Sequence, residues 1–173
     1  MEKLNWEYDE LSGRYIVKGA RVLFANFEGA EQDYNQKGKR NFRLQLDESL
    51  KDEIKRQGVY VRERPGRDEF DDPQYLMKVG VYGDADIRLL SGRTMTKVPI
   101  TTDPATDGGS LIDREFQKGH VENGRIDIEF HVSKNTRVAS SSPYVRVDTM
   151  IIPIRKSKLL DGYDDIDDED EAF

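Results

Sequence analysis

The stretch YIVKGARVLFANF, residues 15–27, is a long apolar-rich run interrupted by Gly19. A glycine inside a strand pattern usually marks a bulge or a bend, because it has no side chain to pack and adopts backbone angles that other residues avoid. We therefore predict a bent strand that contributes to both sides of a curled sheet.

Five further segments alternate apolar and polar residues with the period of a strand. In residues 126–132, Ile126, Ile128 and Phe130 fall on one face, and in residues 41–46 the alternation turns Phe42 toward the core and Arg43 outward. The remaining three segments are residues 59–64, 74–82 and 144–154. Six strand-like segments in one domain predict a mainly β barrel or a sandwich.

One short helix is predicted directly after residue 46. Either Asp47 or Ser49 can cap a helix in which Leu50 and Ile54 share a face, and Gly58 ends it. Three segments have the composition of loops, namely residues 29–40, 64–73 and 101–119. The third is long enough that it is either functional or conceals a short element.

The outward face of the predicted middle strands carries aromatic rings among cations: Tyr60, Arg62, Arg64, Lys78 and Tyr82. Aromatic rings stack on bases of any sequence, and cations follow the phosphates, so this face suits single-stranded nucleic acid. The alternative is an ordinary solvent-exposed sheet face, since Tyr and Arg are good strand formers. The pattern favours an OB-fold-like antiparallel β-barrel with one short helix and long loops, and a sandwich is the other candidate.

The loop at residues 33–41 repeats this chemistry, with one aromatic ring followed by three cations: Tyr34, Lys37, Lys39 and Arg40. Such a loop can close over a bound strand, and a charged hairpin tip is the plain alternative.

The acidic charge of the chain is concentrated at its end. Of the 34 acidic residues, eight lie in residues 161–173, a segment without any basic residue. Residues 1–160 therefore hold 26 acidic and 27 basic residues, which gives them a net charge of +1. Like charges this dense repel one another and bury little apolar surface, so we expect residues 161–173 to be a flexible, disordered tail on a single domain, residues 1–160. A solvating tail needs no apolar residues, yet Tyr163, Ile166 and Phe173 lie among the acids, which points to a partner with a basic groove and an apolar pocket.

By these residues the chain resembles the single-stranded DNA-binding proteins of tailed bacteriophages. The segments that carry the resemblance are residues 26–29, 34–42, 46–50 and 58–62, in sequence NFEG, YNQKGKRNF, LDESL and GVYVR. The resemblance implies an oligonucleotide-binding fold that coats displaced strands in phage replication and recombination, in the host cell cytoplasm. It also implies that Lys37, Lys39, Arg40 and Arg43 form a basic rim and that Tyr34 and Tyr60 stack on bases.

The same resemblance assigns the tail a role in partner binding, through Asp167, Asp168, Glu169, Asp170, Glu171 and Phe173. We expect the tail to occupy the DNA groove as a competing polyanion when DNA is absent. Once DNA frees it, the tail would recruit a phage or host polymerase, helicase or primase. An acidic DNA mimic that inhibits a host nucleic-acid enzyme is the main alternative function, a virion structural protein is a third, and a homodimer is left open.

An enzyme is not expected. The chain has no cysteine, and no Gly-rich phosphate loop, nucleophile elbow or zinc-binding helix motif occurs, so we expect neither cofactor nor metal. His131 falls on an outward strand position, where a solvated histidine is the simpler interpretation. No run of apolar residues approaches the roughly 18 that span a bilayer, so no membrane association is expected.

Overall fold

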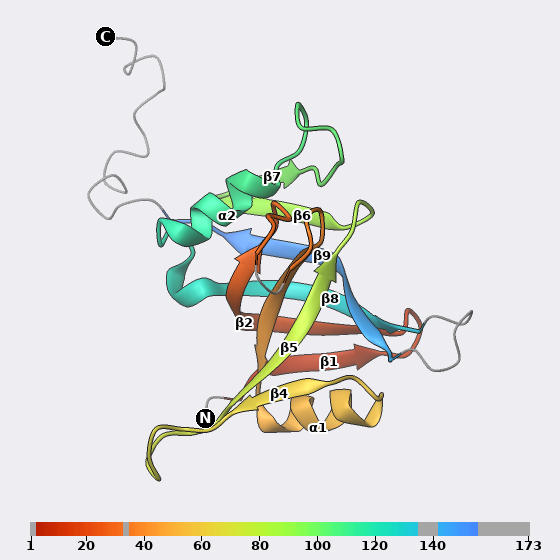
Figure 1. Cartoon of the computed structure of the whole chain (residues 1–173), viewed down its shortest axis with the longest axis vertical. Coiled ribbons are helices and arrows are strands. Elements are labelled where there is room, and N and C mark those ends of the chain that lie inside the picture. The colour runs from red at the N-terminus through yellow and green to blue at the C-terminus, as the bar shows by residue number, and fades with distance from the viewer. Residues whose placement is uncertain (1–2, 33–34, 135–141, 156–173) are drawn as a thin grey trace.

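A computed structural model describes residues 3–32, 35–134 and 142–155 (Figure 1). The strands are β1 (Asn5–Asp9), β2 (Arg14–Asn26), β3 (Arg40–Leu46), β4 (Val61–Arg64), β5 (Gln74–Val81), β6 (Asp86–Ser91), β7 (Thr94–Val98), β8 (Arg125–Ser133) and β9 (Tyr144–Pro153). The helices are α1 (Glu48–Arg56), α2 (Gly109–Gln117) and a 3-10 turn at Glu122–Gly124. The chain is therefore mainly β, as predicted, and the predicted tail, residues 161–173, lies outside the described residues.

Five strands close into a ring in the order β2, β3, β5, β9, β8 and back to β2. Four of these pairings are antiparallel, and the ring closes through a short parallel pair in which Val79 and Gly80 of β5 face Val145 and Arg146 of β9. β4 extends the sheet beyond β5, the β6–β7 hairpin extends it beyond β9, and β1 pairs with β2. The sheet is thus mixed, where the sequence predicted an antiparallel one.

The predicted bend in β2 is present at Gly19, whose φ is 68°, and the register between β2 and β8 shifts between Val17 and Ala20. Asp127 of β8 stabilises the bend, because its Oδ1 accepts a hydrogen bond from the Gly19 N–H at 2.9 Å. A second irregularity, which the sequence did not indicate, lies between Leu23 and Asn26 opposite β3.

The core fills the ring with side chains from every one of its strands. Phe42, Val79 and Phe130 have no exposed surface, which confirms the alternation read from their segments. Phe27 stacks on Phe42 with ring centroids 5.3 Å apart, and Phe116 of α2 stacks on the same Phe27 at 6.0 Å. α2 therefore packs against the ring through an aromatic side chain.

Helix α1 confirms its prediction in detail. Asp47, not Ser49, is the N-cap: its Oδ1 accepts the Leu50 N–H at 2.8 Å, and its Oδ2 accepts the Leu4 N–H at 2.9 Å. Leu50 and Ile54 are the buried residues of the helix. Asp47 thus ties the start of the chain to the helix that separates β3 from β4.

The prediction of a single helix is wrong, because the segment 101–119 contains α2. Its N-cap residue, Gly108, has no side chain to cap the helix, and its buried residues are Gly109, Ile112 and Asp113, so it lacks a strong start signal and a long apolar face. Strands β1, β6 and β7 were also missed. β1 and β7 are mostly exposed and so show no regular alternation. Within the described residues, no helix is long and apolar enough to cross a membrane.

Candidate nucleic-acid interface

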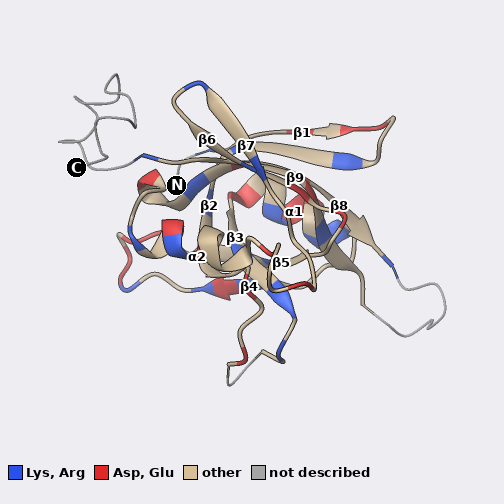
Figure 2. Ribbon diagram, turned by 90° about the horizontal axis from the view of Figure 1, so that it is seen from above, with Lys and Arg blue, Asp and Glu red and all other residues tan. Residues whose placement is uncertain are grey.

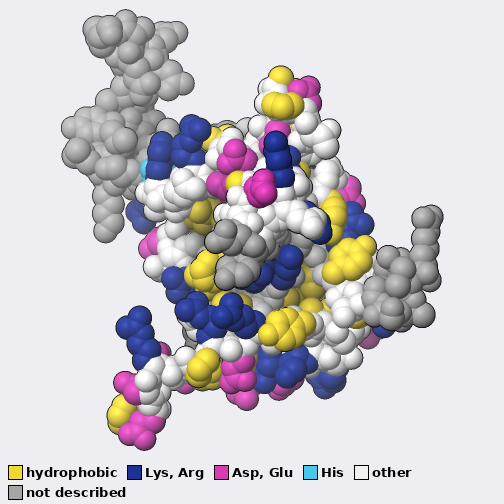
Figure 3. All heavy atoms as spheres, viewed as in Figure 1, with side chains coloured by type: hydrophobic (Ala, Val, Ile, Leu, Met, Phe, Trp, Pro, Cys, Tyr) yellow, Lys and Arg dark blue, Asp and Glu magenta, His cyan; other side chains and the backbone are white. Residues whose placement is uncertain are grey.

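The outward surface of β3, β5 and β4 gathers cations from three neighbouring strands. Arg43 lies directly opposite Lys78 in the β3–β5 pair, and Arg62 lies beside Leu76 in the β4–β5 pair. We call Arg43, Arg62, Arg64 and Lys78 the basic face. Figure 3 shows Lys and Arg side chains gathered over this part of the molecule with hydrophobic side chains between them. The structure therefore brings together four of the predicted DNA-binding cations.

An apolar residue forms the floor of the basic face. Leu76 is only 2% exposed, yet it does not belong to the core cluster inside the ring. It lies between Gln45 and Arg62 in the register, on the outward side of β5. Long charged side chains commonly cover apolar surface with their aliphatic stems and keep the charge in water. Because Leu76 lies on the outward side and is nearly fully buried, neighbouring side chains of this surface must cover it.

The cations of the basic face repel one another. Burial lowers the pKa of Lys78 from its ordinary value, and the neighbouring Arg43 and Lys39 lower it further. Burial and then Arg62 likewise lower the pKa of Arg43. Within the described part of the chain, Arg43, Arg62 and Lys78 form no ion pair with any carboxylate. A polyanion that bound here would relieve this repulsion.

Tyr60 lies at one end of the basic face, immediately before β4, and the residue is 79% exposed. An exposed ring in this position can stack on a base at little cost to the fold. The strand was predicted to begin at Val59, but it begins at Val61.

Tyr82 follows β5 and its ring is held in place. A Cβ atom on Gly80 would lie 2.8 Å from the Tyr82 ring, so the ring lies against the bare backbone of β5. The Arg146 guanidinium lies 4.3 Å from the centre of that ring, and the Tyr144 ring lies 6.5 Å away. Asp84 fixes Arg146 through a 3.1 Å hydrogen bond. Tyr144 and Arg146 were missed because only the parallel β5–β9 pairing brings them to Tyr82.

Asparagine side chains hold together the described residues of the loop between β2 and β3. Asn35 Nδ2 donates to the carbonyls of Ala30 and Lys39 at 3.0 and 2.9 Å, and Asn41 Nδ2 donates to Asn35 Oδ1 at 2.8 Å. Lys37 and Lys39 are exposed on this loop. Tyr34, predicted to stack on bases, lies outside the described residues.

Arg40 does not lie on the exposed rim where it was predicted. Its Nη1 donates to the Phe27 carbonyl and to Asp107 Oδ1, both at 2.8 Å, and its Nη2 donates to the Thr101 carbonyl at 2.8 Å. Asp113 of α2 accepts the backbone N–H groups of Phe27 and Glu28 at 2.7 and 2.9 Å. Arg40 and Asp113 therefore fasten the β2–β3 loop to the segment that contains α2.

Phe24 is an aromatic candidate that the sequence did not single out. It sits in the second irregularity of β2, its φ is 53°, and 64% of it is exposed. A positive φ is uncommon for a bulky side chain and often accompanies function. The preceding residue, Leu23, is the Cα partner of Arg43, so Phe24 borders the basic face.

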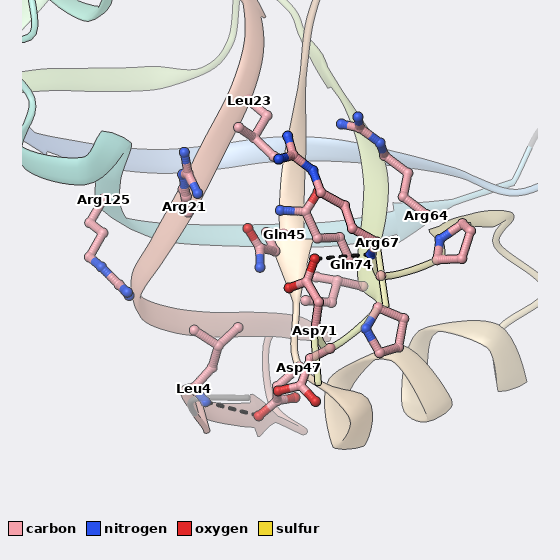
Figure 4. Close-up of a pocket in the computed structure, with 15 residues that line it drawn as sticks. Leu4, Arg21, Leu23, Gln45, Asp47, Arg64, Arg67, Asp71, Gln74 and Arg125 are labelled. Carbon is pink, nitrogen blue, oxygen red and sulfur yellow. Dashed lines mark hydrogen bonds between the residues drawn. The ribbon is translucent and has the colours of Figure 1, made fainter. Parts of the chain in front are cut away.

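A cavity of about 700 Å³ adjoins the basic face at the base of the β4–β5 loop (Figure 4). Four arginines line it: Arg21, Arg64, Arg67 and Arg125. Of these, the sequence predicted only Arg64 as a DNA-binding residue. The others come from β2, β8 and a loop, and no local pattern connects them.

Both histidines have carboxylate partners. His131 Nδ1 lies 2.8 Å from Asp148 Oδ2, and His120 Nδ1 lies 2.6 Å from Glu115 Oε2. No group of three or more potential metal ligands occurs in the described part of the chain. The Asp107 carboxylate accepts a hydrogen bond from Arg40, and the Asp113 carboxylate accepts two backbone N–H groups, as described above.

The comparisons with known proteins find one family and solved structures of one protein. Residues 8–92 match the family described as a putative phage ssDNA-binding domain. This match confirms the resemblance drawn from the sequence. The sequence matches no curated protein.

Two solved structures of the single-stranded DNA-binding protein from bacteriophage Enc34 share the fold at 10% sequence identity. The first has a TM-score of 0.50 and covers 99% of this chain and 100% of that chain. The second, solved in complex with ssDNA, also has a TM-score of 0.50 and covers 91% of this chain and 98% of that chain.

Proposed function

We propose that this protein binds single-stranded DNA without strict sequence preference and coats displaced strands during phage DNA replication and recombination in the host cell cytoplasm. The observation that carries the proposal is the basic face, where Arg43, Arg62 and Lys78 crowd together without a carboxylate partner in the described residues. Tyr60 and Tyr82 flank these cations with exposed rings.

The chemistry of the face favours a single strand over a duplex. Unpaired bases expose their faces for stacking, at about 1–3 kcal/mol per base, whereas a duplex keeps them stacked on one another. The cations contact phosphates and release counterions, so affinity falls as salt rises. Neither contact reads a base sequence.

The family match and the ring of strands support this proposal. A partly open five-stranded barrel that binds along two central strands is the arrangement of OB-folds, and the ring of β2, β3, β5, β9 and β8 fits it. The Enc34 protein has been solved with ssDNA bound. A DNA mimic needs acids spread over its surface, whereas the described strands carry Lys and Arg as well as acids (Figure 2), and β2, β3 and β5 carry no Asp or Glu.

We further propose that residues 1–160 form the DNA-binding unit and that the acidic tail, residues 161–173, competes with DNA for the basic face. When DNA displaces the tail, Phe173 and the acids from Asp167 to Glu171 recruit a replication partner. A chain ending at Leu160 should therefore bind oligo-dT more tightly than the full chain at low salt. Equal affinities would reject the competition.

The decisive experiment is fluorescence polarisation of labelled single- and double-stranded oligonucleotides across a salt series. We expect tighter binding of the single strand and a linear decrease of log K with log salt concentration. Failure to bind oligo-dT at low salt, even after removal of residues 161–173, would reject the proposed function.

A further inference from the structure

The arginine-lined cavity beside the basic face has the properties of a binding subsite. Figure 4 shows Arg21 of β2 on one side, Arg64 and Arg67 on the other, and Gln45 of β3 between them. Its volume, about 700 Å³, falls within the roughly 300–1,000 Å³ typical of ligand pockets. The cavity shares Arg64 with the basic face, so a strand on that face reaches it directly.

Three of its cations have no carboxylate partner. Arg21, Arg64 and Arg67 are exposed, and none forms an ion pair or side-chain hydrogen bond with a residue in the described ranges. Arg125 is the Cα partner of Arg21 and donates to the Gly19 carbonyl at 2.9 Å, so it is held against β2. Guanidinium groups gathered in this way suit phosphate, which accepts their hydrogen bonds in pairs.

Three acidic side chains also line the cavity: Asp47, Asp71 and Asp72. Asp47 caps α1 and accepts the Leu4 N–H, while Asp71 Oδ2 accepts the Arg67 N–H at 3.1 Å. Carboxylates repel phosphate but accept hydrogen bonds from the amino group of a base, as Asp and Glu do with cytosine N4. The arginines therefore suit the phosphate of a nucleotide, and the carboxylates suit the amino group of its base.

The most specific feature of the cavity is the side-chain amide of Gln45. Its Oε1 is buried, and no hydrogen-bond donor in the described residues reaches it. A buried acceptor without a donor carries a desolvation cost that a ligand N–H can remove. Gln74 adds a second amide at the same wall of the cavity.

We propose that this cavity binds one nucleotide unit of the strand, with its phosphate on Arg21, Arg64 and Arg67 and the amino-bearing edge of its base toward Gln45 and Asp71. The inference rests on the proposed function and deepens it. It lengthens the DNA path beyond the basic face and adds a modest preference for cytosine over thymine, because thymine has no amino group.

The test uses the full chain, with oligo-dC and oligo-dT of equal length in a salt series. R21A/R67A removes two exposed cations from the cavity, and R93A/K97A removes two exposed cations from the β6–β7 hairpin as the matched control. For single strands each lost phosphate contact reduces the slope of log K against log salt by about 0.7, so R21A/R67A should reduce it by about 1.4. The control should keep the slope of the unaltered protein, and thermal melting should show all variants folded.

The base contact is tested separately with Gln45→Leu, which keeps the size of the side chain and removes the amide. This variant should lose the preference for oligo-dC while its salt slope stays unchanged. Titration with free dCMP shows whether the site takes an isolated nucleotide instead of a strand.

The outcomes are distinguishable. If the unaltered protein binds neither oligonucleotide at low salt, the proposed function itself fails. If it binds both and R21A/R67A behaves like R93A/K97A, only the cavity inference fails. It is also overturned if R21A/R67A abolishes dCMP binding but leaves strand binding intact, or if Gln45→Leu leaves the base preference unchanged.

Discussion

Arg43 and Lys78 face each other directly across the antiparallel pair of β3 and β5, with both side chains on the outward side of the ring. Like charges in directly opposed positions destabilise a sheet. The basic face therefore holds electrostatic repulsion that a bound phosphate chain would relieve, and a loss of folding stability accompanies the gain in affinity.

Replacing Lys78 with Gln should stabilise the protein and weaken DNA binding. Removing one member of the like-charged pair should raise the free energy of unfolding by about 0.2–1 kcal/mol. The slope of log K against log salt should decrease by about 0.7. Denaturant unfolding and polarisation measure the two effects. K18Q, an exposed strand lysine on the β1 side of β2, is the control and should change neither; a loss of stability in K78Q would contradict the repulsion.

DNA binding should weaken at alkaline pH through Lys78. Its pKa is lowered by burial and by Arg43, so in the free protein Lys78 begins to lose its proton below the usual range for lysine. Phosphates favour the charged form, and binding therefore takes up a proton as the pH rises through that lowered pKa. K78R keeps its charge, so its affinity should fall less from neutral pH to pH about 10. Parallel pH profiles for both proteins would count against this role of Lys78.

Tyr60→Ala should reduce affinity for a single strand by about 1–3 kcal/mol through the loss of base stacking. Because 79% of Tyr60 is exposed, the melting temperature should stay the same. Tyr60→Phe keeps the ring and should retain most of the affinity in the same polarisation assay. Equal losses in both variants would show that the hydroxyl, rather than the ring, makes the contact.

Gly80→Ala should displace the Tyr82 ring, since the new Cβ would lie 2.8 Å from it. If Tyr82 stacks on a base, this change should lower affinity about as much as Tyr82→Ala does. Adding Gly80→Ala to the Tyr82→Ala protein should then have little further effect. A double-mutant cycle of binding free energies measures this coupling. Additive losses would show that the Gly80 substitution does not act through Tyr82.

Arg40→Ala should act on stability, whereas Lys37→Ala should act on DNA binding. Arg40 makes three hydrogen bonds at 2.8 Å, and only 14% of its side chain is exposed. Losing hydrogen bonds to a charged group should cost about 1.5–3 kcal/mol in unfolding free energy. Lys37 is exposed on the loop that precedes Arg40, so its removal should leave stability unchanged and reduce the salt slope. If Arg40→Ala instead reduced the salt slope and Lys37→Ala lowered the stability, Arg40 would belong to the DNA-binding rim.

All six strands predicted from the sequence are present, and helix α1 is capped by Asp47, one of the two predicted candidates. These features depend on alternation along a strand, on the capping chemistry of Asp47 and on Gly19 within β2, all of which are local. The same local rules placed Phe42 inside and Arg43 outside. The short α2 and the exposed β1 and β7 carry too weak a local pattern to be found in this way.

The sequence by itself determined six of the nine strands in the described residues, which face of each turns outward, and therefore that cations and aromatic rings share one surface. Only the tertiary structure decided which of those cations are available. Arg40 is engaged by Asp107, 67 residues further along the chain, while Arg21, Arg64 and Arg67 meet around one cavity. The physical reason is that alternation fixes the direction of a side chain, whereas its partners are fixed by the strand pairing that closes the ring.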